Sequence, residues 1–339
     1  MFIVLLLMLA ETQSAMNKIR RMTIEPPVPL LLSEWGRSSL GILGVKNIGI
    51  HPNRLQSRAS SRPHSVQEKR GWRRANRKGV TMSNVGRTQL GFSEKAGGAH
   101  TSRTIMLAEL ESLFESVPAE APQERYARAI IEENCLAKRS GRTRALTFRH
   151  LVDLYSLNPE LPVFSGFRYF WDQDHKAHGQ LALLAASARD PLLGAVAPKI
   201  LRVPEGTIVT REQVEEMIRE EDPDRFSGAT LKSTAQNINS SLTKSGHLAG
   251  RVKKIRQTLM PSPAAVGYAL YLGWLEGYRG DFLFKSRYCD LLESREDSLM
   301  DFAAQASTRG WLVFKRAGDV VELGFPKLKA HVNQETVSE

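Results

Sequence analysis

The residues of this sequence that could do chemistry are basic and polar side chains gathered in two stretches, 138–149 and 226–260, that contain no Asp or Glu. Lys and Arg bind phosphates and guanine, whereas Asn, Gln, Ser and Thr can also pair with base edges in the major groove. Stretches of this composition favour contact with double-stranded DNA. The candidate DNA-binding residues are Lys138, Arg139, Ser140, Arg142, Thr143, Arg144, Arg149, Lys232, Gln236, Asn239, Lys244, Arg251, Lys253, Lys254 and Arg256.

The first stretch lies between two predicted helices. Residues 123–137 have the spacing of an amphipathic helix, and a further helix is predicted to follow Thr147 as its N-cap. Two helices joined by a short polar turn are typical of a helix-turn-helix unit. We expect the arginines here to meet DNA and Ser140 and Thr143 to hold phosphates. Arginines at a helix start oppose the helix dipole, so helix stability does not explain them, although packing of their stems is an alternative.

The second stretch begins with a predicted helix, residues 228–245, that has two different sides. Its apolar side is expected to pack against the protein, and its polar side to recognise bases. A plain surface helix is the alternative, but a solvated face usually carries both signs of charge, and this one has no acid. The apolar side consists of Leu231, Ala235, Ile238 and Leu242, and the polar side of Lys232, Gln236, Asn239, Ser240 and Thr243.

A basic strand is predicted to follow this helix over residues 250–257. Partial alternation places Lys254, Arg256 and Thr258 on one side of the strand and Ile255, Gln257 and Leu259 on the other. We expect a wing beside the DNA backbone, whose four to six phosphate contacts would give a log-log salt slope of roughly −4 to −5. A sheet edge kept soluble by lysines is the alternative. The strongest phosphate contacts are expected from Arg142, Arg144, Lys254 and Arg256, with weak base contacts from Gln236 and Asn239.

Sequence patterns of enzymes are poor by comparison. The phosphate loop G-x-x-x-x-G-K-[ST], the dinucleotide pattern G-x-G-x-x-G and the nucleophile elbow G-x-S-x-G are all missing from the sequence. His175 and His178, with two nearby aspartates, have only loose metal-ligand spacing, which we interpret as a surface loop. Cys135 and Cys289 cannot form a disulfide framework or a cysteine-based zinc site. We therefore predict no catalytic residue, no metal and no cofactor.

Helices must position most of these residues. The helical period is clear from Thr104 onward, and the predicted fold is mainly α, with two or three winged-helix or helix-turn-helix-like units and a C-terminal β-hairpin. Further helices are predicted at 181–188, 192–201, 211–221, 263–275 and 294–309, and hairpin strands at 311–315 and 320–325. The predicted domains are a disordered basic arm or over-extended start (1–81), an N-terminal helix-turn-helix-like unit (82–160), a helical connector (161–225), a winged-helix-like unit (226–280), a C-terminal helix plus hairpin (281–330) and a tail (331–339).

The net charge is distributed unevenly. The 339 residues include 47 Lys and Arg against 36 Asp and Glu, but residues 1–81 hold 14 of these bases and 4 of these acids. The rest of the chain is nearly neutral, so the case for DNA rests on the two local stretches. The apolar run 1–10 is about half of the roughly 20 residues that a membrane span needs. Because basic residues follow that run rather than precede it, and cysteines are few, a cytoplasmic protein without membrane contact is expected.

Three segments resemble the BrxA family of bacteriophage exclusion (BREX) defence systems. They are the residues from Phe92 to Ala99 (FSEKAGGA), residues 131–144 (IEENCLAKRSGRTR), and the segment from Lys244 (KSGHL) to Pro263. The resemblance covers residues 82–280, mostly in the order of elements. It implies a mostly α fold with winged-helix-like units and double-stranded DNA binding without catalysis. It also implies possible partners in the same system: a DNA methyltransferase, an ATPase and a phosphatase-like protein.

Two other functions stay open at the level of sequence. A winged-helix transcriptional regulator would dimerise and protect one operator. A nuclease or recombinase would require a divalent metal or form a covalent adduct with DNA.

Overall fold

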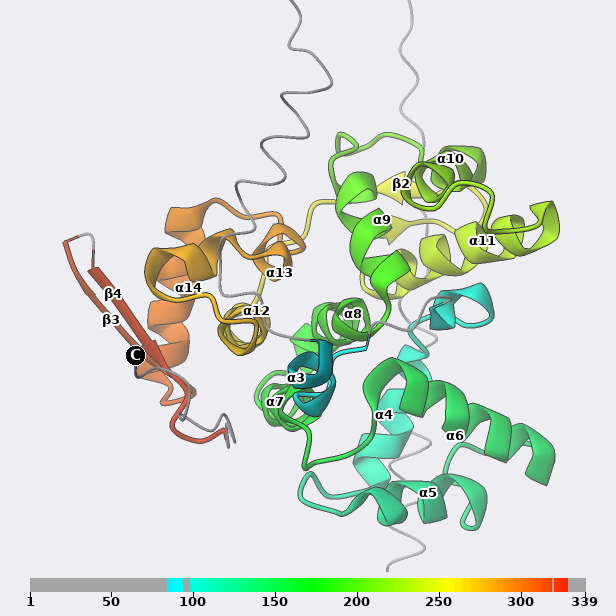
Figure 1. Cartoon of the computed structure of the whole chain (residues 1–339), viewed down its shortest axis with the longest axis horizontal. Helices are drawn as coiled ribbons and strands as arrows, with labels where there is room; N and C mark the ends of the chain where they lie inside the picture. Colours follow the sequence, from blue (N-terminus) through cyan, green and yellow to red (C-terminus); the bar gives the residue numbers. More distant parts are fainter. Residues whose placement is uncertain (1–83, 94–97, 319, 329–339) are drawn as a thin grey trace, which may run out of the picture. The chain divides into compact units, whose positions relative to one another are not determined.

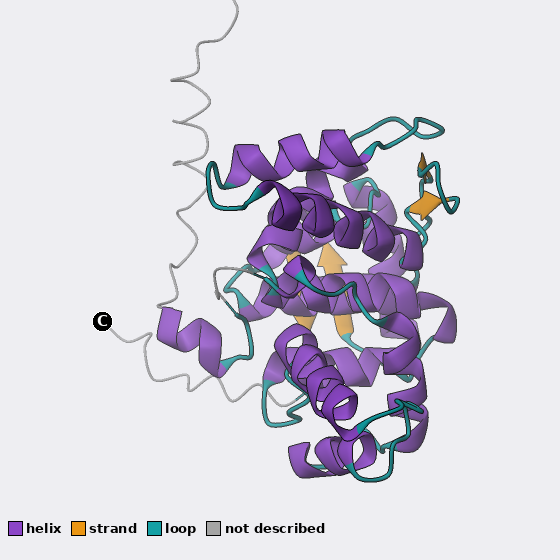
Figure 2. Cartoon of the chain, turned by 90° about the vertical axis from the view of Figure 1, so that its right-hand side faces the viewer, coloured by secondary structure: helices purple, strands orange, loops and turns teal. Residues whose placement is uncertain are grey.

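The computed structural model describes residues 84–93, 98–318 and 320–328. The arm predicted at 1–81 and the tail predicted at 331–339 lie outside the described residues. The described part is mainly helical, with two small antiparallel strand pairs, as Figure 2 shows. This confirms the mainly α class and the C-terminal hairpin. None of the described helices combines the length and the apolar composition needed to cross a membrane.

The elements follow one another along the chain as Figure 1 labels them. They are α3 (Asn84–Gln89), η1 (Ala99–Thr101), α4 (Leu107–Ser116), α5 (Gln123–Ile131), α6 (Gly141–Tyr155), α7 (Pro162–Trp171), η2 (His175–Ala177), α8 (His178–Arg189), α9 (Pro191–Leu201), α10 (Arg211–Glu221), α11 (Gly228–Lys244), β1 (Leu248–Ala249), β2 (Ile255–Arg256), α12 (Pro263–Leu275), η3 (Gly280–Lys285), α13 (Arg287–Asp290), α14 (Glu296–Thr308), β3 (Val313–Ala317) and β4 (Val320–Gly324).

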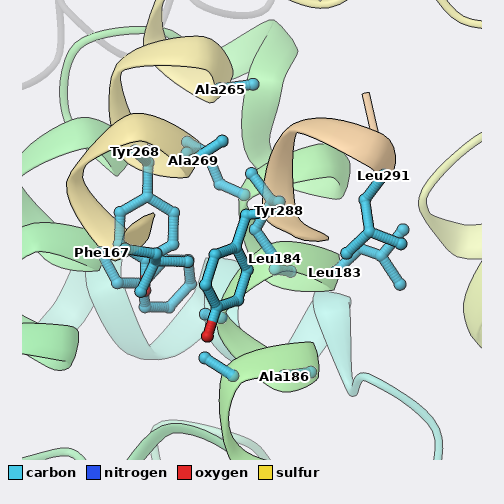
Figure 3. Packing of buried hydrophobic residues seen from close by; sticks show 14 of the residues in the cluster. Phe167, Leu183, Leu184, Ala186, Ala265, Tyr268, Ala269, Tyr288 and Leu291 are labelled. Carbon is cyan, nitrogen blue, oxygen red and sulfur yellow. The ribbon is translucent and has the colours of Figure 1, made fainter. Parts of the chain in front are cut away.

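The core is centred on α7, α8 and α12. Both α8 and α12 are apolar around nearly their whole circumference, which is typical of helices enclosed on all sides. Figure 3 shows Phe167 of α7, Leu184 of α8 and Tyr268 of α12 packed together, with Tyr288 of α13 beside them. Fully burying a side chain of this size contributes about 1.5–3 kcal/mol. This core forms the support on which the more polar helices rest.

The helices α4, α5 and α6 form the N-terminal part of the described chain, and α5 packs against both of the others. The prediction that the second helix follows Thr147 is wrong, because α6 begins at Gly141. Ser140 is its N-cap: the Ser140 hydroxyl accepts a hydrogen bond from the Thr143 amide at 3.2 Å. Thr147 is buried within the helix. The preceding helix ends at Ile131, earlier than predicted.

The helices α10 and α11 pack against each other and are followed by the pair β1–β2. Residues 206–209 extend this small sheet: the Val209 amide donates to the Lys254 carbonyl at 2.7 Å, and the Arg256 amide to the Thr207 carbonyl at 2.9 Å. The boundary predicted at 225/226 therefore falls between two helices that are in contact. The bounds predicted for α10 and α12 agree with the structure.

The C-terminal part consists of α14 and the hairpin β3–β4, in which Val313 pairs with Gly324 and Ala317 with Val320. The strand β3 packs on α14, and β4 on η3. This part contains none of the predicted DNA-binding residues.

Candidate nucleic-acid interface

Three arginines are exposed at or on α6, two of them at its start and Arg149 farther along the helix. Arg139, Arg142 and Arg149 are exposed, and none forms an ion pair or a side-chain hydrogen bond with any described residue. The helix begins here because Ser140 caps it, so the Ser140 oxygen already serves the Thr143 amide. Ser140 therefore positions the arginines, and a phosphate would have to share its hydroxyl.

Two other cations of the same stretch are engaged within the protein. Lys138 Nζ lies 3.1 Å from Glu109 Oε1, so α4 supplies it with a carboxylate. Arg144 Nη1 donates to the Glu132 carbonyl at 3.3 Å, while its Nε is buried without a hydrogen bond. Both side chains hold the turn against neighbouring helices and are less available to a ligand than the exposed arginines.

The polar side of α11 is exposed over only part of its length. Lys232 and Gln236 are exposed, and Ser240 and Thr243 are partly exposed. Asn239 is only 5% exposed, so the prediction that it contacts bases is wrong. The apolar side is buried as predicted. The pKa of the Glu212 carboxyl on α10 is lowered first by its own backbone hydrogen bond, then by Arg211, and least by the charge of Lys232.

The turn between β1 and β2 presents the most prominent cations of the second stretch. Gly250, with φ +94°, lies so close to the Lys253 carbonyl that a Cβ there would overlap it. This tight turn leaves Arg251 and Lys253 exposed and without ion-pair partners among the described residues. Lys254 is half-buried, and its Nζ donates to the Gly250 carbonyl at 2.8 Å. Burial lowers the pKa of Lys254.

Arg256 lies inside the protein, so its predicted role as a phosphate contact is corrected. Its side chain is 1% exposed and forms an ion pair with Glu293, and it donates to the Leu201 carbonyl at 3.0 Å and the His247 carbonyl at 3.2 Å. The neighbouring Ile255 is exposed instead. Within the two residues of β2, the side predicted to face solvent is therefore buried, and the side predicted to face inward is exposed. Burial and the Arg256 charge lower the pKa of His247 to about 3, so this ring is neutral.

The two basic stretches meet at one pocket of about 340 Å³. The short helix η1 lies between α6 and α11 and contacts both (Figure 1), and the segment that follows η1 forms part of the pocket wall. Lys138 and Thr143 line the pocket from the first stretch, and Lys244 lines it from the second. Sequence reasoning placed these residues in separate units. Arg103, which it did not single out, joins them.

A serine, a histidine and an aspartate beneath this pocket have the connectivity of a catalytic triad. His100 Nδ1 lies 2.8 Å from Asp190 Oδ2, and His100 Nε2 lies 2.8 Å from Ser241 Oγ. The Ser241 hydroxyl also donates to the Asn237 carbonyl and accepts from the Ile105 amide. All three side chains are at most 1% exposed. Because the serine proton is directed to the backbone and no solvent reaches it, the cluster serves to hold three segments together.

Asp190 is the anchor of this cluster. It caps α9 by accepting from the Leu192 and Leu193 amides, and it accepts from the His100 amide at 3.0 Å. Gly98, with φ +53°, passes so close that a Cβ would overlap the carboxylate. Burial alone would raise the pKa of Asp190, but the hydrogen bonds and charge of His100 hold it below its ordinary range.

Of the two histidines predicted to lie in a surface loop, His175 is exposed and His178 is buried. His178 begins α8, stacks on Trp171 with ring centroids 3.6 Å apart, and is buried. Within the described ranges, no three His, Cys, Asp or Glu side chains are grouped so that they could hold a metal ion. Cys289 is buried, and burial raises the pKa of its thiol to about 12.

No family model matches this chain. The curated proteins likewise gave no relative of significant sequence similarity.

The residues that sequence reasoning missed are those whose partners lie far away in the chain. His100 is separated from Asp190 by 90 positions and from Ser241 by 141 positions. No local spacing could connect them. Glu293, the partner of Arg256, also lies in a different predicted domain. Because no acid lies near Arg256 in the sequence, the sequence indicated an exposed cation without a partner.

Proposed function

We propose that this chain binds double-stranded DNA without catalysing a reaction on it, as a component of a BREX-type phage-defence system. The observation that carries the DNA-binding part is a set of exposed cations that have no ion-pair partner among the described residues. They lie at the start of α6 and farther along it, on α11 and on the β1–β2 turn. The set consists of Arg139, Arg142, Arg149, Lys232, Arg251 and Lys253.

These cations support the function because they lie on segments that contain no acid, whereas an exposed helix such as α10 carries both signs of charge. There, Arg211 and Arg219 both form ion pairs with Glu215. A surface that is merely solvated carries both signs in this way. Phosphates would supply the missing negative charge, and each neutralised phosphate would release counterions.

The order of elements in the second unit supports the same proposal. The elements α10, α11, β1, the 250–254 turn and β2 follow one another as helix, helix, strand, turn and strand. Before them, residues 206–209 form a single β-bridge and backbone hydrogen bonds with β2. We infer a winged-helix unit in which α11 is the recognition helix and the turn is the wing. The helices α5 and α6 supply the helix-turn-helix-like unit. With Asn239 buried, Gln236 is the main amide left for bases, which favours weak sequence preference.

The BREX part of the proposal rests on the sequence resemblance alone. It places the protein in the cytoplasm beside a DNA methyltransferase, an ATPase and a phosphatase-like protein. It is tested by plaque counts on cells that carry the defence cluster with and without this chain. Equal plaque counts would contradict it.

The DNA-binding part is tested by measuring duplex affinity against salt for the full chain. We expect the variant Arg251→Gln/Lys253→Gln to reduce the log-log salt slope by about 2, and Arg142→Gln/Arg149→Gln to do the same, at about 0.9 per lost phosphate contact. Lys176→Gln is the control, because Lys176 is an exposed lysine of η2 outside these segments. A wild-type slope in both double variants would overturn the proposal.

The same preparation separates the two alternatives. One sharp footprint on a long duplex would favour a transcriptional regulator over a protein with weak sequence preference. Strand cleavage that depends on Mg²⁺, or a covalent adduct, would favour a nuclease or recombinase and contradict the proposal of binding alone.

A further inference from the structure

The pocket between α4, α6, α11 and the segment after η1 is positively charged. Three cations line it, Arg103, Lys138 and Lys244, and its one acidic residue is Glu109. The cations come from three separate elements, so the fold gathers their charge although the sequence does not. Its volume of about 340 Å³ is near the lower end for pockets that bind small molecules.

Glu109 already supplies one negative charge inside the pocket. It contacts Lys138 Nζ at 3.1 Å, and Lys244 Nζ instead donates to the Thr104 hydroxyl at 2.7 Å. Burial on its own raises the pKa of Glu109, but the hydrogen bond and charge of Lys138, with the charge of Lys244, lower it overall. One ionised carboxylate thus balances one of three cations, and the remaining two positive charges are uncompensated within the pocket.

Hydroxyl groups complete the wall. Thr143 and Thr147 lie one turn apart on α6, and Thr104 lies on the opposite segment. Thr147 is 7% exposed and lines the pocket together with Thr143 and Thr104. Hydroxyl groups and cationic side chains in one wall favour a polar ligand that carries negative charge.

We propose that this pocket binds a phosphate group. A phosphate offers several acceptor oxygens, which match the cationic and hydroxyl donors of the wall, and its charge of more than one unit matches the surplus. A ligand cation would meet net repulsion, and an apolar ligand would leave the cationic donors of the wall without an acceptor. The group could belong to a free nucleotide or to the end of a DNA strand. The pocket is distinct from the exposed cations, and its occupancy does not depend on duplex binding by them.

The proposal is tested by calorimetric titration of the full chain with inorganic phosphate. We expect Lys244→Gln and Lys138→Gln each to weaken binding about tenfold, because each removes a charged donor. Glu109→Gln is expected to tighten binding roughly three- to tenfold, because it removes a competing anion while keeping the size of the side chain. Lys176→Gln, outside the pocket, should bind like the wild type. Thermal unfolding of each variant verifies that it is folded.

Opposite results would overturn the proposal. If phosphate does not saturate the wild type or Glu109→Gln, or if Lys244→Gln binds as well as the wild type, the pocket is not a phosphate site. If Glu109→Gln does not fold, the two lysine variants decide alone. If Glu109→Gln weakens phosphate binding, the carboxylate does not compete with the phosphate for Lys138, and the proposal is wrong.

Two further titrations identify the source of the phosphate. Deoxyadenosine 5′-monophosphate that binds more tightly than inorganic phosphate indicates a nucleotide. A short duplex with a 5′-phosphate that displaces inorganic phosphate, when the unphosphorylated duplex does not, indicates a strand end. Failure of the exposed-cation variants to alter duplex affinity would leave these titrations unaffected, so the two proposals can fail separately.

Discussion

Residues 138–149 and residues 250–256 carry similar charge but are built on different elements, one on the start of a capped helix and the other on a tight turn and a short strand. Arg139 and Arg142 remain exposed at the start of this helix, and Arg149 is exposed farther along it. On the strand, successive side chains point to opposite faces. Arg256 therefore points into the protein, where it forms an ion pair with Glu293.

A basic sequence therefore does not determine which of its charged side chains are exposed and which are buried. On the turn, Arg251 and Lys253 are free to meet a ligand. Five positions after Arg251, an identical residue holds together β2, the end of α9 and the segment before α14. The two arginines should therefore respond oppositely to substitution, one through stability and the other through DNA affinity.

The largest effect is expected from Arg256→Ala. The substitution leaves the Glu293 carboxylate and the Leu201 and His247 carbonyls without their donor in a buried site. Breaking a buried ion pair by removing one partner costs about 3–5 kcal/mol of unfolding free energy. Arg251→Ala, the matched control, should stay within about 0.5 kcal/mol. Urea denaturation measures both, and equal midpoints would contradict the assignment of Arg256 to the interior.

A smaller effect is expected at the cluster that fixes the segment 98–106 between α6 and α11. Asp190 has a pKa below its ordinary value when folded, so it stabilises the fold above about pH 4. That contribution is lost as the pH falls through the folded pKa. Asp190→Asn should lower the unfolding free energy at pH 7 by about 1–3 kcal/mol, because His100 loses a charged partner. It should also make stability less dependent on pH below 4.

Urea midpoints of the wild type and Asp190→Asn between pH 3 and 7 measure this difference. Parallel pH profiles for the two proteins would show that Asp190 does not supply the acid-sensitive stability. Phosphate titration of Asp190→Asn adds a second readout. A loosened 98–106 segment would displace Arg103 and Thr104, so binding at the pocket should weaken as well.

The sequence was most informative where local signals act alone. The bounds of α10 could be predicted because Thr210 and Gln213 form a capping box, and those of α12 because Ser262 and Pro263 mark its start. The start of α6 could not, because Ser140 and Thr147 are both competent caps, and only the packing of the helix decides between them.

The candidate site was predictable in composition but not in arrangement. The strand predicted over 250–257 is confined to Ile255–Arg256, where Arg256 faces inward and pairs with Glu293, far along the chain. Asn239 is buried although its neighbours in the polar stripe are partly exposed. The pocket and the His100 cluster depend on a segment that packs between two helices, and no periodicity within either helix indicates that contact.

The smallest effect on stability is expected from substitutions of Ser140 at the start of α6. If Ser140 serves as an N-cap, Ser140→Ala should lower the unfolding free energy by about 1 kcal/mol, and Ser140→Gly by only a few tenths, because Gly is a tolerated cap. Duplex affinity should change little in either variant once the protein is folded. Urea denaturation and the salt-dependent duplex assay together test this. If both variants keep wild-type stability but bind DNA weakly, Ser140 contacts a phosphate as first predicted, and the cap is incidental.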